Sequence, residues 1–244
     1  MNAMLWSLRS VYVRCWRYAF ACPVLFSLPI VTEAMQHVAE YSQGFYADLA
    51  SAKANEHSML RMAFGTVKIL SVLIARYWVI RWLEWGDGKR TFGFDGRSIA
   101  TFTPWLIFEA AITFPTIWLP VFAPSLGRPV MILSIISFVL SLLFSDWSRA
   151  ASIGQSGGPV RSARKVAPVF LWALAFNLIA LLPIMTLHYA LMMVAMNGHH
   201  VIRWIVLAAD TIVVGYLSAI VCGVPWFVSE HALARFAVRH AKLQ

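Results

Sequence analysis

Four charged residues interrupt otherwise apolar stretches of this sequence, and such groups are candidates for chemistry. Lys68 and Arg76 share one apolar stretch, while Glu109 and Asp210 lie in two others. A charge within a lipid bilayer is costly, so it usually faces a partner charge, water or the protein interior. Two interpretations stay open. The four residues form either a proton or substrate relay, or two structural ion pairs, Lys68 with Asp210 and Arg76 with Glu109.

The remaining reactive and metal-binding side chains form no motif. His188 is the one histidine inside a predicted membrane span, so the sequence does not predict the facing pair of histidines that a transmembrane haem requires. The three cysteines (Cys15, Cys22 and Cys222) lack metal-ligand or redox spacing. No zinc-protease, nucleophile-elbow or phosphate-loop motif occurs. We therefore expect no catalytic residue, no metal site and no cofactor.

The composition indicates which solvent surrounds these charges. Of the 244 residues, 60% are apolar and 13% are charged, with 11 Trp and 16 Phe. An average soluble domain is about 45–50% apolar and about 25% charged. The mean hydropathy is +0.69. One core of this size cannot bury such an excess, so the composition excludes a soluble enzyme and indicates a membrane protein.

Apolar stretches of about 20 residues predict membrane-spanning helices. Six such stretches occur, at 18–36, 62–83, 99–120, 129–146, 167–196 and 201–229. Residues 3–17 mix aromatic residues with arginine, as is typical of a helix at the membrane interface. The predicted fold is therefore all-α, a polytopic bundle forming one transmembrane domain over residues 1–244.

The net charge of +9 follows from topology. With six spans, 15 Lys and Arg fall on the side of both termini, four fall on the opposite side, and Lys68 lies within a span. Cytoplasmic segments carry such an excess. We therefore expect both termini to be cytoplasmic, in a bacterial inner membrane, and we expect no nucleic-acid partner.

A basic segment precedes the fifth span. Arg161, Arg164 and Lys165 follow the glycine-rich turn at 154–158. Basic residues at the cytoplasmic leaflet attract anionic lipid by about 1 kcal/mol each. These three residues are the predicted contacts for anionic head groups.

The layout of several segments supports a resemblance. The first span ends in LPIVTEAM, the glycine-rich turn leads into VRSARKVAPVFLWALAFNLIALLPI, and the last span runs into VSEHALARFAVRHA. This is similar to uncharacterised bacterial six-helix inner-membrane proteins, including the membrane domain fused to some glycerophosphodiester phosphodiesterases. In residues the resemblance covers chiefly 157–183, with Arg161, Ser162 and Arg164 at the turn. It implies no catalytic residues, and we expect no fused phosphodiesterase domain.

The absence of a catalytic motif and of a ligand set favours a non-catalytic function. The first prediction is a scaffold or accessory subunit of a larger membrane assembly, with membrane lipids and other membrane-protein subunits as partners. The alternative is a small transporter or permease component that uses Lys68, Arg76, Glu109 and Asp210. A third possibility is a lipid-modifying enzyme.

Overall fold

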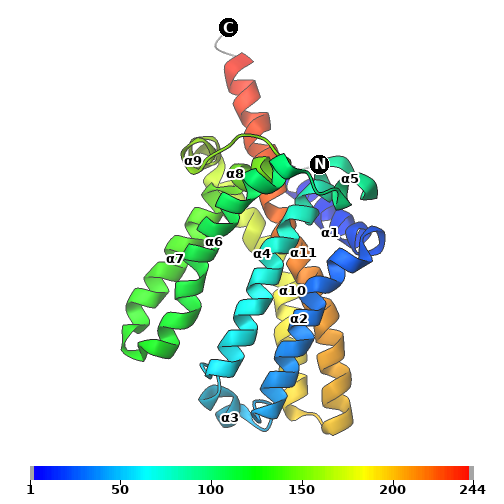
Figure 1. The fold of residues 1–244 in the computed structure, drawn as a ribbon, viewed down its shortest axis with the longest axis vertical. Helices are drawn as coiled ribbons and strands as arrows, with labels where there is room; N and C mark the ends of the chain where they lie inside the picture. The colour runs from blue at the N-terminus through cyan, green and yellow to red at the C-terminus, as the bar shows by residue number, and fades with distance from the viewer. Residues whose placement is uncertain (1–2, 242–244) are drawn as a thin grey trace.

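The protein is helical throughout the part that the computed structural model describes, residues 3–241, with side chains described for 4–237 (Figure 1). The long helices are α2 (Pro23–Ser42), α4 (Met59–Trp85), α6 (Gly96–Phe122), α7 (Gly127–Leu143), α10 (Phe170–Asn197) and α11 (His200–Ala241). The remaining helices are α1 (Ala3–Ala21), which lies at one end of the bundle, and the short helices α3 (Leu49–Ala54), α5 (Gly88–Phe92), α8 (Ser145–Ser152) and α9 (Pro159–Val166), with 3-10 turns η1 (Pro124–Leu126) and η2 (Ala167–Val169). The predicted all-α class is confirmed.

The long helices have the length and hydropathy of membrane spans. Within the described residues, five are long and apolar enough to cross a bilayer, or six if α1 and α2 count as one bent span. The prediction of a multi-pass membrane protein agrees with this. The predicted span at 62–83 corresponds to α4, although it carries three basic residues.

The first predicted span, 18–36, has the wrong boundaries. The helix is interrupted at Cys22, where φ is −132° and ψ is 54°, and Pro23 begins α2. A proline suits the first position of a helix and disfavours helical geometry in the residue before it. Residues 18–21 therefore belong to α1, and α2 continues to Ser42. As a result, His37 and Glu40 lie inside a long helix rather than in a loop.

Two more predicted spans differ from the observed helices in their boundaries. The predicted span at 129–146 corresponds to α7, which ends at Leu143, and a separate helix, α8, begins at Ser145. Ser145 and Asp146 are already buried in α8. The span at 201–229 is part of a longer helix that continues to Ala241.

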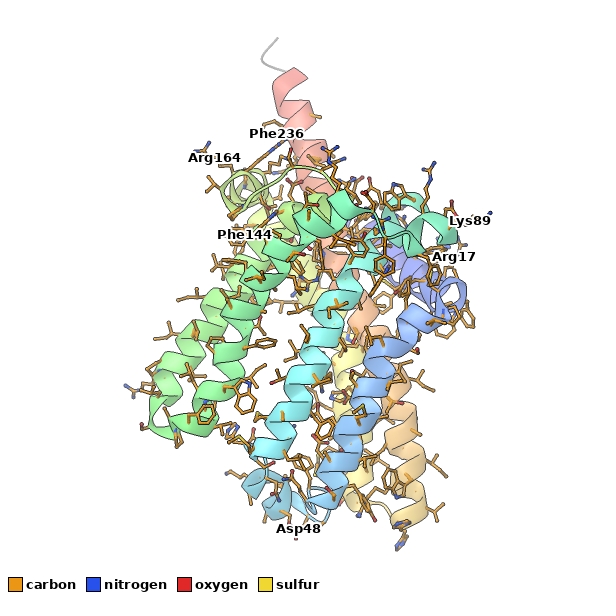
Figure 2. The ribbon with its side chains drawn as sticks, viewed as in Figure 1. Arg17, Asp48, Lys89, Phe144, Arg164 and Phe236 are labelled. Atoms are coloured by element: carbon orange, nitrogen blue, oxygen red, sulfur yellow. The ribbon has the colours of Figure 1, made fainter. Side chains whose placement is uncertain are left out.

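Helix α1 and the short helices lie at the two ends of the bundle (Figure 1). Helices α1, α5, α8 and α9 and the last turns of α11 lie at one end, called here the termini end, and α3 lies at the other, the α3 end (Figure 1). Figure 2 shows the basic residues Arg17, Lys89 and Arg164 at the termini end and Asp48 at the α3 end. The charge asymmetry read from the sequence is thus an asymmetry of the folded molecule.

Helix α1 crosses the termini end at 98° to α2. Its exposed residues combine aromatic rings, among them Trp6 and Trp16, with cations, among them Arg9 and Arg17. A helix of this composition is stable where lipid chains meet head groups. The interfacial position of α1 stays a prediction.

Paired cysteine labelling tests the orientation. Lys53 lies in α3 and Ser156 in the turn before α9, both exposed, whereas the native cysteines are buried. We expect an impermeant maleimide to label Lys53→Cys in intact cells and Ser156→Cys only after permeabilisation, because the cation excess lies on the side of Ser156. The cysteine-containing wild type is the control. Labelling of both variants from the same side would contradict the odd number of spans (α4, α6 and α7) between the two positions and the bilayer sides assigned to them.

Candidate functional site

One face of α2 carries polar residues into the bundle. Glu33, His37 and Glu40 are four and three residues apart, a spacing that places them on the same side of a helix. These three residues and Gln36 are buried. Polar side chains in this position need partners from the neighbouring helices.

Those partners lie at matching depth. Counted from the α3 end of each helix, Glu33, Lys68 and His188 lie nine residues in, and Asp210 lies ten residues in. At a rise of about 1.5 Å per residue, this depth is about 14–15 Å. Four helices therefore contribute ionisable side chains to a single layer of the bundle, called here the polar layer. With its supporting residues, the layer comprises Glu33, Gln36, His37, Glu40, Tyr46, Arg61, Lys68, His188 and Asp210.

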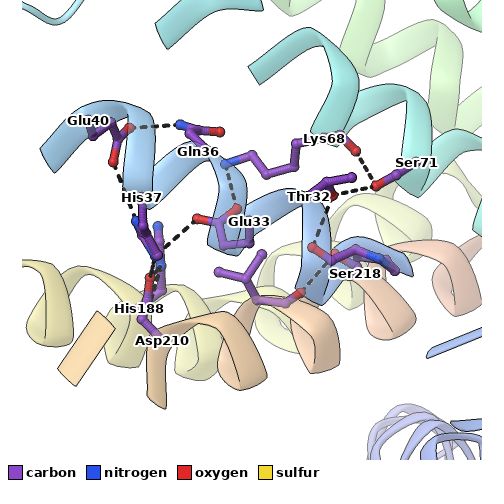
Figure 3. A network of polar contacts seen from close by, with 12 residues as sticks. Thr32, Glu33, Gln36, His37, Glu40, Lys68, Ser71, His188, Asp210 and Ser218 are labelled. Carbon is purple, nitrogen blue, oxygen red and sulfur yellow. Dashed lines mark hydrogen bonds and ion pairs between the residues drawn. The ribbon is translucent and has the colours of Figure 1, made fainter. Parts of the chain in front are cut away.

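Asp210 is the meeting point of two histidines (Figure 3). Its side chain is fully buried, and its Oδ2 lies 3.1 Å from Nε2 of His37. Nδ1 of His188 lies 2.8 Å from Oδ1 and 3.0 Å from Oδ2. One carboxylate thus joins α2, α10 and α11.

Lys68 has a different partner from the one predicted. Its Nζ lies 2.9 Å from Oε2 of Glu33, so the predicted Lys68–Asp210 ion pair is wrong. The depth estimate correctly placed Lys68 and Asp210 in one layer, but Glu33 on α2 takes the lysine and the histidines take the aspartate.

Glu40 holds the other side of His37. Its Oε1 accepts hydrogen bonds from Gln36 and Arg61, each at 2.8 Å. Its Oε2 accepts a short hydrogen bond from the hydroxyl of Tyr46, which also lies 2.7 Å from Nδ1 of His37. Burial and the nearby Glu40 carboxylate raise the pKa of Tyr46, so its phenol keeps its proton and remains a donor. The imidazole of His37 is therefore fixed in orientation.

The polar layer carries an excess of negative charge. Its three carboxylates, Glu33, Glu40 and Asp210, face two permanent cations, Arg61 and Lys68. Buried charges without compensation are strongly unfavourable. The layer therefore favours one further positive charge, either a protonated histidine or a bound cation.

Three of these side chains could hold a metal ion. Glu33, His37 and Asp210 are all buried, and each offers a ligand atom within 4.8 Å of the others. The sequence-based prediction of no metal-ligand set missed this group because 18–36 was taken as the span, leaving His37 outside it. The glutamate-x3-histidine-x2-glutamate spacing was the available signal.

The second predicted ion pair is present. Nη1 of Arg76 lies 3.9 Å from Oε1 of Glu109, and both side chains are buried. The guanidinium also lies over the ring of Trp105, with 4.9 Å between Cζ and the ring centroid, and Ser141 donates a short hydrogen bond to Glu109. This pair connects α4 to α6 and α7 and shares no contact with Glu33, His37 or Asp210 among the interactions of the described residues.

The predicted lipid contacts do not act as one patch. Arg161 and Arg164 are exposed on α9 at the termini end, whereas Nζ of Lys165 lies 2.7 Å from Oδ2 of Asp146. Ser162 is buried between them and bonds to the backbone of Trp147 and Leu143. Contact of Arg161 and Arg164 with anionic head groups stays a prediction, and Lys165 has its charge compensated within the protein.

Comparisons with protein-family models, with curated proteins and with solved structures give no match to this chain. The resemblance to six-helix inner-membrane proteins remains a prediction from the residues that carry it.

Proposed function

We propose that the protein is a small cation transporter or the membrane component of one, with the polar layer as the point where the cation is bound during its passage. The observation that carries this proposal is the convergence of ionisable side chains from α2, α4, α10 and α11 nine or ten residues from the α3 end, where two buried carboxylates accompany one permanent cation, Lys68. A negative layer of this kind lowers the free energy of a cation between two apolar regions.

Two further features support transport over a static ion pair. Arg61, Lys68 and His188 each remain about one-fifth exposed, so the layer reaches the surface of the bundle on the α4 and α10 sides. Pro183 lies inside α10, five residues before His188, and removes a backbone hydrogen bond there. The carbonyl group of Ile179 is thereby left without its usual helical partner, nine residues before His188.

A scaffold or accessory subunit is the second candidate, and α7 is the observation that favours it. Helix α7 buries one residue, Leu142, and leaves large apolar side chains exposed over the rest of its length, including Met131, Ile132, Ile135 and Ile136. This surface suits lipid or an apolar helix of another subunit. Purification from native membranes in a fixed ratio with a second membrane protein would support this candidate.

Charge movement in proteoliposomes tests transport. We expect the purified wild type, on a solid-supported membrane, to give currents in response to a gradient of at least one of Na⁺, K⁺, Mg²⁺, Mn²⁺ or Zn²⁺. Asp210→Asn keeps the size of the side chain but removes the charge at the meeting point of the histidines, so the current should fall at least tenfold.

The matched control is Glu56→Gln, which removes an exposed carboxylate outside the polar layer and should leave the current unchanged. Both variants are compared at equal amounts of reconstituted, monodisperse protein. No current from the wild type with any of the five cations, or equal currents from wild type and Asp210→Asn, would refute the transport proposal.

A further inference from the structure

We infer that Glu33, His37 and Asp210 form a binding site for a divalent transition-metal cation of the Zn²⁺ class, with His188 as a neighbouring fourth donor. The further statement that this cation is the one transported rests on the proposed function. The binding site itself follows from the side chains and is tested separately.

The spacing of the donor atoms fits a tetrahedral ion. Zinc binds nitrogen and carboxylate oxygen at about 2.0–2.2 Å, which puts neighbouring ligand atoms of a tetrahedron about 3.3–3.6 Å apart. Nε2 of His37 lies 3.1 Å from Oδ2 of Asp210 and 3.6 Å from Oε1 of Glu33. All three donors lie within 4.8 Å of one another. The two distances from His37 thus lie within a few tenths of an ångström of the tetrahedral value.

The surroundings of His37 match those of a metal ligand. A ligating imidazole almost always uses its second nitrogen for a hydrogen bond to a carboxylate, carbonyl or water, which fixes the ring. Nδ1 of His37 lies 2.7 Å from the Tyr46 hydroxyl and 3.4 Å from Oε2 of Glu40, on the side opposite Glu33 and Asp210. Glu40 is thus a positioning residue for His37.

The neighbouring lysine does not occupy the position of the metal. Lys68 contacts Oε2 of Glu33, while Oε1 of the same carboxylate faces His37. The ammonium therefore orients Glu33 and leaves one oxygen available. With neutral histidines, a divalent ion would change the net charge of the polar layer from −1 to +1, so it would replace the negative excess by a single positive charge.

The donor types select among cations. Imidazole nitrogen favours Zn²⁺ and neighbouring transition metals, whereas Mg²⁺ and Ca²⁺ favour sites made of oxygen alone. The cysteines are buried elsewhere in the bundle, and Sγ of Cys15 and Cys222 donate to backbone carbonyl groups. We therefore expect nitrogen and oxygen ligands without sulfur.

Equilibrium binding of Zn²⁺ to detergent-purified protein tests the site. The protein carries a purification tag without histidine, is stripped with chelator, and is titrated with ZnCl₂ in an isothermal titration calorimeter. We expect one ion per chain in the high-affinity phase, and no corresponding phase with MgCl₂. X-ray absorption at the zinc edge should show nitrogen and oxygen ligands at about 2.0–2.1 Å and no sulfur ligand near 2.3 Å.

Variants assign the ion to these residues. His37→Gln and Asp210→Asn should each weaken Zn²⁺ binding at least a hundredfold, and Glu40→Gln about tenfold, as expected for a residue that orients a ligand. The matched control is His199→Ala with His200→Ala, which removes two exposed histidines in the α10–α11 turn and should leave the high-affinity phase intact. Variants are compared only where their elution profiles in size-exclusion chromatography match that of the wild type. If the changes at His37 and Asp210 prevent folding, His188→Gln replaces them in the binding test, because His188 is partly exposed.

The outcomes separate this inference from the transport proposal. Zn²⁺ binding that depends on His37 together with the absence of any current would retain the metal site and refute transport. A current without high-affinity Zn²⁺ binding would retain transport and refute the metal site. Stoichiometric binding that survives His37→Gln, Asp210→Asn and His188→Gln would place the metal elsewhere and also refute the inference.

Discussion

Replacing Glu109 with leucine is expected to lower the free energy of unfolding by about 3–5 kcal/mol. The change leaves the guanidinium of Arg76 buried without its carboxylate partner, and the nearby ring of Trp105 compensates only part of that charge. The measurement is the denaturation curve of the purified protein in a mild detergent, followed by the loss of helix signal. Glu56→Gln, which removes an exposed carboxylate, is the control and should unfold with the wild type.

A double variant shows whether the loss comes from the pair. Arg76→Leu with Glu109→Leu removes both charges, so it should recover most of the stability lost in Glu109→Leu. In the more conservative Glu109→Gln, the cation current per folded molecule should stay at the wild-type level, because Glu109 does not contact the polar layer. Additive losses in the double variant would show that the two residues do not stabilise each other, and a folded Glu109→Gln without current would place Glu109 in the transport path.

Replacing Gly215 with leucine is expected to lower the free energy of unfolding by about 3 kcal/mol, at the upper end of the usual cost of overpacking. A Cβ at this position of α11 would lie 2.4 Å from Cγ1 and 2.9 Å from Cδ1 of Ile30 on α2. The Ile30 side chain must then shift, and we expect the larger leucine to push the two helices apart as well. Gly215 lies five residues after Asp210, and Ile30 lies three residues before Glu33, so the displacement also separates His37 from Asp210.

The expected result has two parts, measured on the same preparation. The denaturation midpoint falls, and Zn²⁺ binds at least tenfold more weakly than to the wild type. Ile30→Ala in the Gly215→Leu background removes the atoms that the leucine would meet and should restore much of both properties. Gly127→Ala is the control, because a Cβ at Gly127 meets no atom within 4 Å. Unchanged stability and binding in Gly215→Leu would show that close contact between α2 and α11 does not position the layer.

The sequence predicts a membrane protein and the order of its helices, because each spanning helix depends only on the apolar residues of its own segment. A run of about 20 apolar residues must become a helix in a bilayer, whatever its neighbours are. The same reasoning found α4 despite Lys68, Arg76 and Arg81, since long cationic side chains can leave an apolar helix for partners elsewhere. It also found the Arg76–Glu109 pair, because only one carboxylate on the adjoining span lay at a comparable depth.

Arg81 shows where a sequence count and a structural role differ. It contributes to the basic excess on the side of the termini, yet its side chain is buried and its guanidinium donates to the carbonyl groups of Arg90, Gly93 and Ser152. The count predicts a side of the membrane from the sum of charges. It carries no information on which charges are solvated and which hold a loop in place.

The partner of Lys68 and the composition of the polar layer were decided by the tertiary structure. Depth along a helix comes from residue number, but the direction in which a side chain points depends on how each helix is rotated against its neighbours. Glu33 and Asp210 lie at similar depths, so depth alone does not decide which of them Lys68 contacts. The packing of α2 between α4 and α11 places Lys68 against Glu33 and the two histidines against Asp210. The break at Cys22 and Pro23 adds to this, because it moves His37 and Glu40 from an expected loop onto a buried helical face. The sequence alone therefore determined that charges must be paired inside this membrane protein, and the rotation and boundaries of its helices decided which charges meet.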